Sequence, residues 1–476
     1  MKLLNTLSGE KEEILKPERG ALNLFVCGPT VYDKAHLGHA RTYISFDTLV
    51  RFLRSQGYKV FYLQNITDVD DKIIERARTA HMDPLALARL NDAAYRKTMK
   101  QIGVTSVSKY ARASDYIPEI VKQIETLVAR GHAYVIEGSG YYFDISTFSD
   151  YGKLSKRTVA QAEDAMTRID ENLKKRNRGD FALWKFVAVS DKNKKKKFAL
   201  ENSEPAWNTK LGWGRPGWHI EDTAITETFF GPQYDIHGGG EDLKFPHHEA
   251  EIAQQEAASG KKPFVRIWLH TGFIRVRGEK MSKSLNNFIT IEDFLKTNSV
   301  DTLRWLVLSH HYRSPINFDD TTAKSAAQSL DSLKEFWERL LFVAKVGEKK
   351  GSTMDIPSLA ARVRGTFIEA LSDDFNTPEA IAALWSYVND LNPNLWKYSR
   401  SEAKQAAKPI EEALTLFGIS LKSEPIPSKI KKLAKERELY RHNKQFTQSD
   451  DLRASIGALG YSIDDTPMGP FVRKIS

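Results

Sequence analysis

A strand, helix, strand pattern near the start of the chain constrains the fold most. The run LNLFVC (residues 22–27) is short and apolar, and Gly20 and the turn-forming GPT bound it, as is typical of a buried strand. Apolar residues at helical spacing follow over residues 42–55, and this helix should end before Gly57. KVFYLQNIT (59–67) predicts a second strand. Because such units join parallel strands by a right-handed crossover, we expect an α/β fold with a doubly wound parallel sheet.

Later segments extend this sheet and interrupt it. Helical spacing predicts a helix over residues 117–128, and AYVIEGSGYYFDIS (133–146) resembles a hairpin with Gly-Ser at its turn. The polar stretch 153–203 predicts an insertion outside the sheet. The sheet should resume near residues 234–237 and 265–270.

Beyond about Ser325 the pattern is helical. One apolar stripe comprises Ala326, Leu330, Leu333, Phe336, Trp337, Leu340 and Leu341. A further helix is predicted to begin with Thr377 as N-cap and Pro378 at its first position. A last basic helix over about residues 429–442 should lead into a short tail. This pattern predicts an α-helical bundle.

Charge and cysteine content restrict the class of protein. Lys and Arg (70) exceed Asp and Glu (61), and the net charge of +9 modestly favours a polyanionic partner. One cysteine cannot form an internal disulfide, and no run approaches the roughly 20 apolar residues that span a bilayer. The first residues do not resemble a signal peptide. We therefore expect a cytoplasmic protein that is not bound to a membrane.

HLGH (residues 36–39) lies between the predicted strand and the N-terminus of the predicted helix. There the imidazoles of His36 and His39 can donate hydrogen bonds to phosphate oxygens, where the helix dipole already favours negative charge. Gly38 lets a nucleotide base pack against the backbone. The motif is short, so by itself it indicates a phosphate site only weakly.

EKMSKSLNN (residues 279–287) places Lys280 and Lys283 among serines after a glycine. Such a flexible loop can bring ammonium groups onto a transferring phosphate. A lysine-rich loop alone is more often a solvated turn. Because the chain carries HLGH as well, a loop that contacts phosphate becomes a better interpretation than a solvated turn.

Cys27, His247 and Glu251 suggest a metal site. His247 and Glu251 are four apart and would share one helix face, while the only thiol lies at a strand end, where α/β active sites form. A lone cysteine is more often a small buried hydrophobic residue, so both interpretations stay open on these residues alone.

The sequence does not complete three other active-site motifs. HGGG (237–240) is not accompanied by a G-x-S-x-G nucleophile elbow, and HHEAEI lacks the second histidine of H-E-x-x-H because Ile252 occupies that place. No Walker A sequence is present, so ATP would not be bound in the manner of a P-loop.

HLGH and KMSKS together resemble the signatures of class I aminoacyl-tRNA synthetases, and their surroundings resemble the cysteinyl-tRNA synthetase family. The resemblance runs in family order through nearly the whole chain. Its segments are CGPTVYDKAHLGHAR (27–41), NITDVDDKII (65–74), DFALWK (180–185), GRPGWHIE (214–221), DIHGGGEDLKFPHHEAEIAQ (235–254), EKMSKS (279–284), DDFNTPEA (373–380) and DDLRASIGALGYSIDDTPMG (450–469).

The resemblance implies ATP-dependent activation of L-cysteine, followed by transfer of the cysteinyl group to the 3' end of tRNA(Cys). It implies that His36 and His39 stabilise the phosphates, that Lys283 contacts ATP and that Lys280 assists. It places Gly38 in the ATP site and Mg²⁺ beside the ATP. A monomer is expected.

The resemblance also implies one zinc ion that binds the substrate thiol. Shape alone separates cysteine from serine poorly, whereas zinc strongly favours a thiolate. The implied ligands are Cys27, His247, Glu251 and position 222, where many relatives have a second cysteine. Here that residue is Asp222. Aspartate can ligate zinc through oxygen, so the expected set is harder than one with two thiolates.

The same resemblance places five residues near the cysteine: Gly28, Thr67, Trp218, His237 and Asp242. It divides the chain at the following boundaries. Residues 1–110 and 206–295 form two halves of a Rossmann-like catalytic domain, 111–205 a connective insertion, 296–325 a stem-contact region, 326–420 an anticodon-binding helical bundle and 421–476 a small C-terminal module.

Two alternative functions stay open. A cysteine ligase of the mycothiol pathway resembles the catalytic core, but the C-terminal match argues against it. A non-catalytic RNA-binding paralogue is disfavoured by intact HLGH and KMSKS.

The run KNKKKK (192–197) is either a solvated loop or a contact for tRNA phosphates. Trp337, Trp385 and Trp396 are core residues by pattern, although any of them could stack on an anticodon base.

Overall fold

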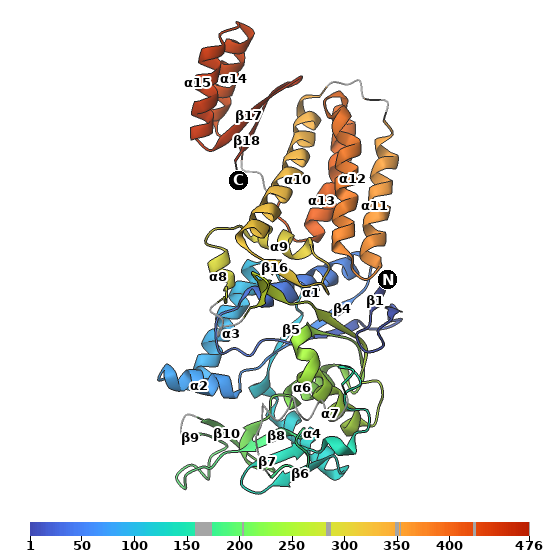
Figure 1. Ribbon diagram of the computed structural model, residues 1–476, viewed down its shortest axis with the longest axis vertical. Helices are drawn as coiled ribbons and strands as arrows, with labels where there is room; N and C mark the ends of the chain where they lie inside the picture. Colours follow the sequence, from blue (N-terminus) through green and yellow to red (C-terminus); the bar gives the residue numbers. More distant parts are fainter. Residues whose placement is uncertain are drawn as a thin grey trace. The chain divides into compact units, whose positions relative to one another are not determined.

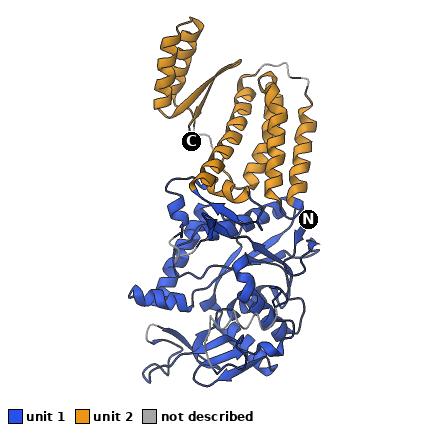
Figure 2. Cartoon of the chain, in the orientation of Figure 1, with its two compact units in different colours: residues 1–300, 310–319, 372–375 blue, residues 301–309, 320–371, 376–476 orange. Residues whose placement is uncertain are grey.

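The computed structural model describes residues 1–157, 174–201, 204–281, 287–347, 352, 354–421 and 425–475. The chain divides into two compact units (Figure 2). Unit 1 comprises residues 1–300, 310–319 and 372–375, and unit 2 comprises residues 301–309, 320–371 and 376–476. No helix within the described ranges has both the length and the apolar character needed to cross a membrane.

A five-stranded parallel sheet forms the centre of unit 1 (Figure 1). Its strand order is β13-β12-β3-β4-β5, and every neighbouring pair is parallel. The strands are β3 (Leu22–Val26), β4 (Val60–Ile66), β5 (Lys109–Arg112), β12 (Tyr234–Gly240) and β13 (Val265–Thr271). The predicted doubly wound parallel sheet is confirmed, including its resumption after the insertion.

Helix α1 (Leu37–Ser55) connects β3 to β4 and begins five residues before the predicted start. The early start was missed because the first turn is the polar HLGH segment, which shows no apolar periodicity. Close packing of α1 on β12 requires a glycine, since a Cβ on Gly238 would lie 2.2 Å from Cζ of Phe46. The body of α1 therefore packs closely on the sheet at this glycine.

The insertion forms a separate six-stranded antiparallel sheet with the order β6-β7-β8-β11-β10-β9. Its strands are β6 (Ala133–Ile136), β7 (Gly140–Phe143), β8 (Phe181–Phe186), β9 (Phe198–Glu201), β10 (Glu204–Thr209) and β11 (Gly212–Pro216). The predicted hairpin is confirmed as β6 and β7. The stretch 153–203 lies outside the parallel sheet as predicted, although its described part supplies two strands, and residues 158–173 and 202–203 are not among those described.

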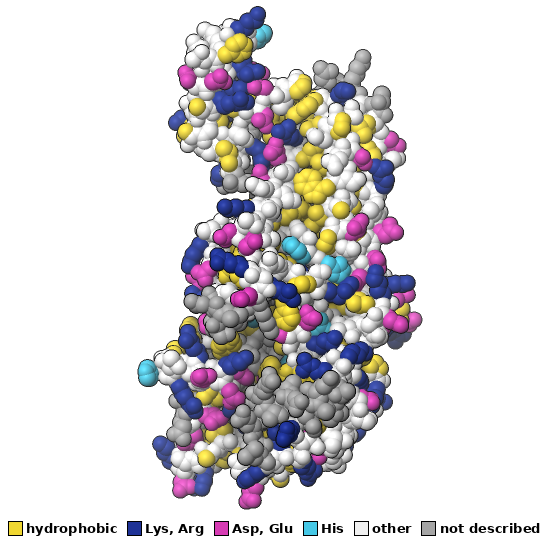
Figure 3. Space-filling model, in the orientation of Figure 1, with side chains coloured by type: hydrophobic (Ala, Val, Ile, Leu, Met, Phe, Trp, Pro, Cys, Tyr) yellow, Lys and Arg dark blue, Asp and Glu magenta, His cyan; other side chains and the backbone are white. Residues whose placement is uncertain are grey.

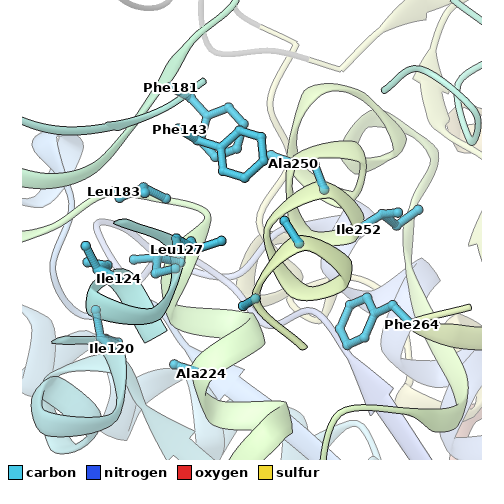
Figure 4. Packing of buried hydrophobic residues seen from close by; sticks show 14 of the residues in the cluster. Ile120, Ile124, Leu127, Phe143, Phe181, Leu183, Ala224, Ala250, Ile252 and Phe264 are labelled. Carbon is cyan, nitrogen blue, oxygen red and sulfur yellow. The ribbon is translucent and has the colours of Figure 1, made fainter. Parts of the chain in front are cut away.

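Three helices share an apolar core beside this sheet: α4 (Ile117–Ala129), α6 (Ile220–Phe230) and α7 (Glu249–Ser259). Figure 4 shows Ile120, Ile124 and Leu127 of α4 with the neighbouring members of this cluster. Ala224 of α6 and Ala250 of α7 belong to the same cluster. The core therefore fixes the two helices that carry Asp222 and Glu251.

Unit 1 also contains smaller elements. They are β1 (Lys2–Leu4), β2 (Lys11–Glu13), α2 (Asp71–Thr79), α3 (Pro84–Gln101), β14 (Ile274–Val276), β15 (Glu279–Lys280), α8 (Ile291–Phe294) and β16 (Ile316–Phe318). Strands β15, β14 and β16 form a three-stranded sheet.

Unit 2 is largely helical, which confirms the predicted bundle. Its helices are α9 (Val300–Leu308), α10 (Asp320–Val346), α11 (Ile356–Ser372), α12 (Thr377–Leu391), α13 (Arg400–Leu416), α14 (Ser428–His442) and α15 (Phe446–Ala458). The chain ends in a hairpin of β17 (Tyr461–Thr466) and β18 (Gly469–Lys474).

Two predictions for unit 2 were wrong. The N-cap of α12 is Asn376 and not Thr377, because the Asn376 side chain accepts a hydrogen bond from the amide of Glu379 at 3.2 Å. The expected short tail instead contains α15 and the terminal hairpin. Helix α15 was missed because it is mostly polar, with Ser449 and Ile456 as its buried residues.

Positive and negative side chains are mixed on the face of the protein that Figure 3 shows. Figure 3 shows Lys and Arg side chains interspersed with Asp and Glu over the visible face. The net charge of +9 is thus not gathered into one large basic patch on that face.

Candidate active site and metal centre

The HLGH segment forms the N-terminus of α1. His36 is the N-cap, and its Nδ1 accepts a hydrogen bond from the amide of Gly38 at 3.0 Å. The rings of His36 and His39 stack with centroids 3.8 Å apart. Burial lowers the pKa of His39 well below its usual range, and the charge of His36 lowers it further. A neutral imidazole at a helix N-terminus retains one N–H donor for an anionic ligand.

Gly38 is required by this arrangement. A Cβ on Gly38 would lie 2.8 Å from Cε1 of His36, so any side chain would displace the capping imidazole. The backbone at this position also remains open to a bound group.

A cavity of about 320 Å³ lies at the carboxyl ends of the parallel strands. Many of the predicted site residues line it: Cys27, Gly28, His36, Gly38, His39, Thr67, Trp218 and Asp242. Met281 lines the cavity too. Strand β15 brings the backbone of Lys280 to β14, next to the start of the KMSKS loop. The predicted Lys283 lies outside the described residues.

Cys27, Asp222 and His247 converge beside this cavity, although they are far apart in the sequence. The Sγ of Cys27 lies 3.4 Å from Oδ2 of Asp222, and that oxygen lies 3.0 Å from Nε2 of His247. One ligand atom from each of the three residues lies within 4.8 Å of the others. All three side chains are buried.

Glu251, the fourth predicted ligand, adjoins this cluster. Its Oε1 lies 3.2 Å from Nε2 of His247, and its ligand atoms group with those of His237 and His248 in a second trio. Within the described part of the chain, no hydrogen-bond donor satisfies either carboxylate oxygen of Glu251. A buried carboxylate without donors is costly unless a cation accompanies it.

The electrostatics of the cluster fit a metal ion. Burial raises the pKa of Cys27 well above its usual range, and the charge of Asp222 raises it further. Burial also raises the pKa of Glu251, with the charges of Asp222 and Glu221 adding to the effect. A divalent cation would offset this crowding of acidic groups, and thiol, imidazole and carboxylate are ligands that such cations take. The residues present can therefore hold a metal ion.

Asn65, at the end of β4, supports the cluster and was not predicted as a site residue. Its Nδ2 donates a hydrogen bond to Oδ1 of Asp222, and its Oδ1 accepts one from the amide of Gly28 at 2.5 Å. It therefore ties Asp222 to the backbone next to Cys27. The only signal in the sequence was its place in the segment NITDVDDKII, because the residue type alone indicates no role.

Neighbouring groups also orient His247 and Thr67. Nδ1 of His219 lies 2.8 Å from Nδ1 of His247, and the ring of Trp218 stacks on His247 at 4.7 Å between centroids. Thr67 donates a hydrogen bond to Glu221. Such contacts fix the orientation of a ligating side chain. His219 and Glu221 were missed for the same reason as Asn65.

His237 differs from the other predicted cysteine contacts. It is fully buried, its Nδ1 lies 2.7 Å from the hydroxyl of Tyr234, and its ring stacks on Trp268 at 4.2 Å. Among the described residues it does not line the cavity. Its Nδ1 lies 3.6 Å from Oε2 of Glu251.

Comparisons with known proteins agree with this geometry. The family model described as tRNA synthetases class I (C) catalytic domain matches residues 13–328, and the DALR domain model matches residues 366–422. Curated proteins named Cysteine--tRNA ligase are similar over almost their full length. The Thermoplasma volcanium protein is 41% identical and covers 98% of both chains, and the Caldicellulosiruptor saccharolyticus protein is 39% identical and covers 100% of both.

Solved structures show the same fold at low identity. The methionyl-tRNA synthetase of Mycobacterium tuberculosis with methionyl-adenylate has a TM-score of 0.59 at 16% identity, covering 84% of this chain and 90% of its own. The LeuRS–tRNA–LeuAMS complex from Agrobacterium radiobacter has a TM-score of 0.62 at 13% identity, covering 85% and 86%. The matched catalytic and DALR models and the full-length relatives establish that this chain belongs to the cysteine–tRNA ligase family of class I aminoacyl-tRNA synthetases.

Proposed function

We propose that the chain activates L-cysteine with ATP and transfers the cysteinyl group to the 3' end of tRNA(Cys), with a zinc ion selecting the substrate thiol. The observation that carries this proposal is the convergence of the single cysteine with Asp222 and His247 beside the HLGH cavity. A site with one protein thiol next to a phosphate-binding helix N-terminus suits a substrate that brings its own sulfur.

In the first step the cysteine carboxylate attacks the α-phosphorus of ATP, and pyrophosphate leaves. His36 and His39 hold phosphate oxygens at the N-terminus of α1, and Lys283 of the KMSKS loop neutralises charge as it develops. Lys280 assists from the start of that loop, and Gly38 allows the nucleotide to approach the backbone. Mg²⁺ accompanies the ATP.

The metal ligands in this proposal are Cys27, Asp222, His247 and Glu251. A bound zinc ion supplies affinity for a thiolate over a hydroxyl, which separates cysteine from serine. Gly28, Thr67 and Trp218 shape the amino-acid end of the cavity. Asp242 is suited to pair with the substrate ammonium, while the buried His237 has its Nδ1 3.6 Å from Oε2 of Glu251.

The tRNA partner follows from the family. The DALR match supports binding of tRNA(Cys) through the helical unit. We propose a monomer that works in the cytoplasm.

The test is to measure cysteine-dependent pyrophosphate exchange, charging of tRNA(Cys) and bound metal for the wild type and for Asp222→Ala. The wild type should exchange, charge and retain about one zinc per chain, whereas the variant should lose metal and discriminate less against serine. Asp191→Ala is a matched control, because its side chain is 91% exposed on the insertion. Exchange without charging of any tRNA would contradict the assignment and favour a cysteine ligase with another acceptor.

A further inference from the structure

A network of hydrogen bonds between buried polar side chains links helices α4, α6 and α7. The members of this polar network are Gln123 of α4, Thr223 of α6, and Gln254 and Gln255 of α7, and all four are buried. We infer that Thr223 and Gln254 are positioning residues of the metal centre. They set the distance from α6, which carries Asp222, to α7, which carries Glu251. The inference rests on the proposed function and adds residues that act on the metal through its ligands.

Gln254 joins the start of α6 to α7. Its Nε2 donates a hydrogen bond to the carbonyl of His219, the N-cap of α6, and another to Oγ1 of Thr223 at 2.8 Å. Gln254 lies three positions after Glu251, and residues at this spacing are neighbours on one face of a helix. Thr223 directly follows Asp222. The side chain of Gln254 therefore connects the backbone beside one metal ligand to the helix turn that carries another.

Gln123 closes the polar network. The hydroxyl of Thr223 donates to Oε1 of Gln123 at 2.7 Å, with the carbonyl of Ile220 as a second acceptor at 3.2 Å. Nε2 of Gln123 donates to Oε1 of Gln255 at 2.5 Å. Because Gln254 and Gln255 are neighbours on α7, the network passes through all three helices and returns to its start. A sliding movement of α6 along α7 would break both hydrogen bonds of Gln254.

Stability alone does not explain the polar network. A buried polar atom without a partner lowers stability, whereas apolar side chains of similar size could fill the same space. Within the described part of the chain, Oε1 of Gln254 and Nε2 of Gln255 meet no hydrogen-bond partner. The surrounding core of the three helices is apolar, as at Ile124 and Ala224. What the network adds is one register of α6 against α7, which directional polar contacts specify more narrowly than apolar packing does.

The metal centre needs this register because its ligands come from separate segments. Asp222 lies on α6 and Glu251 on α7, while His247 lies in the turn before α7. Oδ2 of Asp222 lies 3.0 Å from Nε2 of His247, and Oε1 of Glu251 lies 3.2 Å from the same nitrogen. Distances from a metal ion to its ligands hold to about ±0.2 Å, so even a small shift of α6 along α7 displaces Asp222 from the ion. Loss of a hydrogen bond in the network should therefore weaken metal binding without removing a ligand.

Two substitutions of Thr223 separate its hydrogen bonds from its shape. Thr223→Val keeps the shape and removes the hydroxyl, whereas Thr223→Ser keeps the hydroxyl. Competition with a chromophoric chelator measures the zinc affinity of the full chain. We expect that affinity to fall roughly 10–100-fold in Thr223→Val and to stay within about threefold of the wild type in Thr223→Ser.

Thr228→Val is the matched control on α6. The Thr228 hydroxyl donates to the carbonyl of Ala224 in its own helix at 2.8 Å and to no other acceptor among the described residues. Its removal should change zinc affinity by less than about threefold, because no contact to α4 or α7 is lost. A loss in Thr228→Val or Thr223→Ser as large as that in Thr223→Val would overturn the inference.

Gln254→Met distinguishes positioning from a purely structural role. Methionine is close to glutamine in volume, so the urea midpoint of the metal-free protein should match that of Thr228→Val, while zinc affinity falls at least about tenfold. In pyrophosphate exchange with excess zinc, the KM for cysteine should rise at least about fivefold and the KM for ATP should stay within about twofold, because the HLGH contacts are unchanged.

Three results would contradict the inference. They are wild-type zinc affinity in both Thr223→Val and Gln254→Met, a loss of affinity that the metal-free stability matches, and an equal rise in both KM values. Failure of the proposed function differs from all three, because the wild type would then show no cysteine-dependent exchange while the zinc affinities still compare the variants.

Discussion

Asp222 presents its two carboxylate oxygens to different partners. Oδ2 faces Cys27 and His247, whereas Oδ1 accepts the hydrogen bond from Asn65. The carboxylate is therefore arranged to offer one oxygen to a metal ion while the amide holds the other. A thiolate at this position would need no such partner, because sulfur would present a single ligand atom.

The proposed role of Asp222 as an oxygen ligand predicts that a sulfur atom in its place tightens metal binding. We expect Asp222→Cys to bind zinc about tenfold more tightly, or about 1.4 kcal/mol, because a second thiolate suits zinc better than a carboxylate. Competition with a chromophoric chelator measures the affinity. Equal or weaker binding by the variant would show that Asp222 is not a ligand.

Asn65 should matter more for metal binding while Asp222 is present, because one of its hydrogen bonds goes to Asp222 and another holds the amide of Gly28 in either background. We expect Asn65→Ala to weaken zinc binding roughly 10–100-fold, as is typical for loss of a group that orients a ligand. In the Asp222→Cys background the same change should cost far less, and a double-mutant cycle of affinities measures the difference. Asn91→Ala is the control, because the Asn91 side chain donates to the carbonyl of Val31 at 3.0 Å and to no other acceptor among the described residues. Equal losses in both backgrounds would assign Asn65 a purely structural role.

At the level of helices and strands, α1, which begins with HLGH, packs closely on β12. The space between them admits no side chain at Gly238, where a Cβ would meet the ring of Phe46. We expect Gly238→Ala to lower the free energy of unfolding by about 1–3 kcal/mol, because overpacking forces the helix or the strand to shift. Urea denaturation followed by circular dichroism measures this.

A glycine without close neighbours provides the contrast. Gly365 lies within α11, and a Cβ there would meet no atom of the described residues within 4 Å apart from the backbone of its own helix. Gly365→Ala should therefore leave stability unchanged or raise it by up to about 1 kcal/mol. A comparable loss of stability in both variants would contradict the packing argument.

The same elements show what the sequence could predict. Apolar periodicity identified β3, β4 and the body of α1, because these segments bury one face or both. It missed the first turn of α1, whose polar residues face the cavity. It missed α15 because an exposed polar helix has almost no apolar stripe. Single residues such as Asn65 escape prediction because their role depends on a partner 157 positions away.

At the scale of the whole molecule, buried neutral histidines link stability to pH. Burial lowers the pKa of His39, and it lowers the pKa of His270 to about 3. In the unfolded chain both groups would titrate near 6.5. Below that pH the unfolded chain binds protons that the folded chain does not, so stability is present above about 6.5 and is lost as the pH falls toward 3.

We therefore expect the free energy of unfolding to decrease between pH 7.5 and pH 5.5, by up to about 1.4 kcal/mol per pH unit for each such histidine below pH 6.5. Urea midpoints at several pH values measure the slope. His270→Gln should make the slope shallower, since it removes one titrating group. A slope that is flat, or that rises as the pH falls, would contradict the buried neutral state of these histidines.

The central claim is that Cys27 is the one sulfur that the protein supplies to a zinc ion whose other sulfur comes from the substrate. X-ray absorption spectroscopy of the zinc-loaded protein counts these sulfur ligands. The account predicts one sulfur ligand in the free protein, two when L-cysteine is bound, and one when serine is added instead. A count of zero in the free protein, or a count that L-cysteine leaves unchanged while cysteinyl-adenylate still forms, would contradict it.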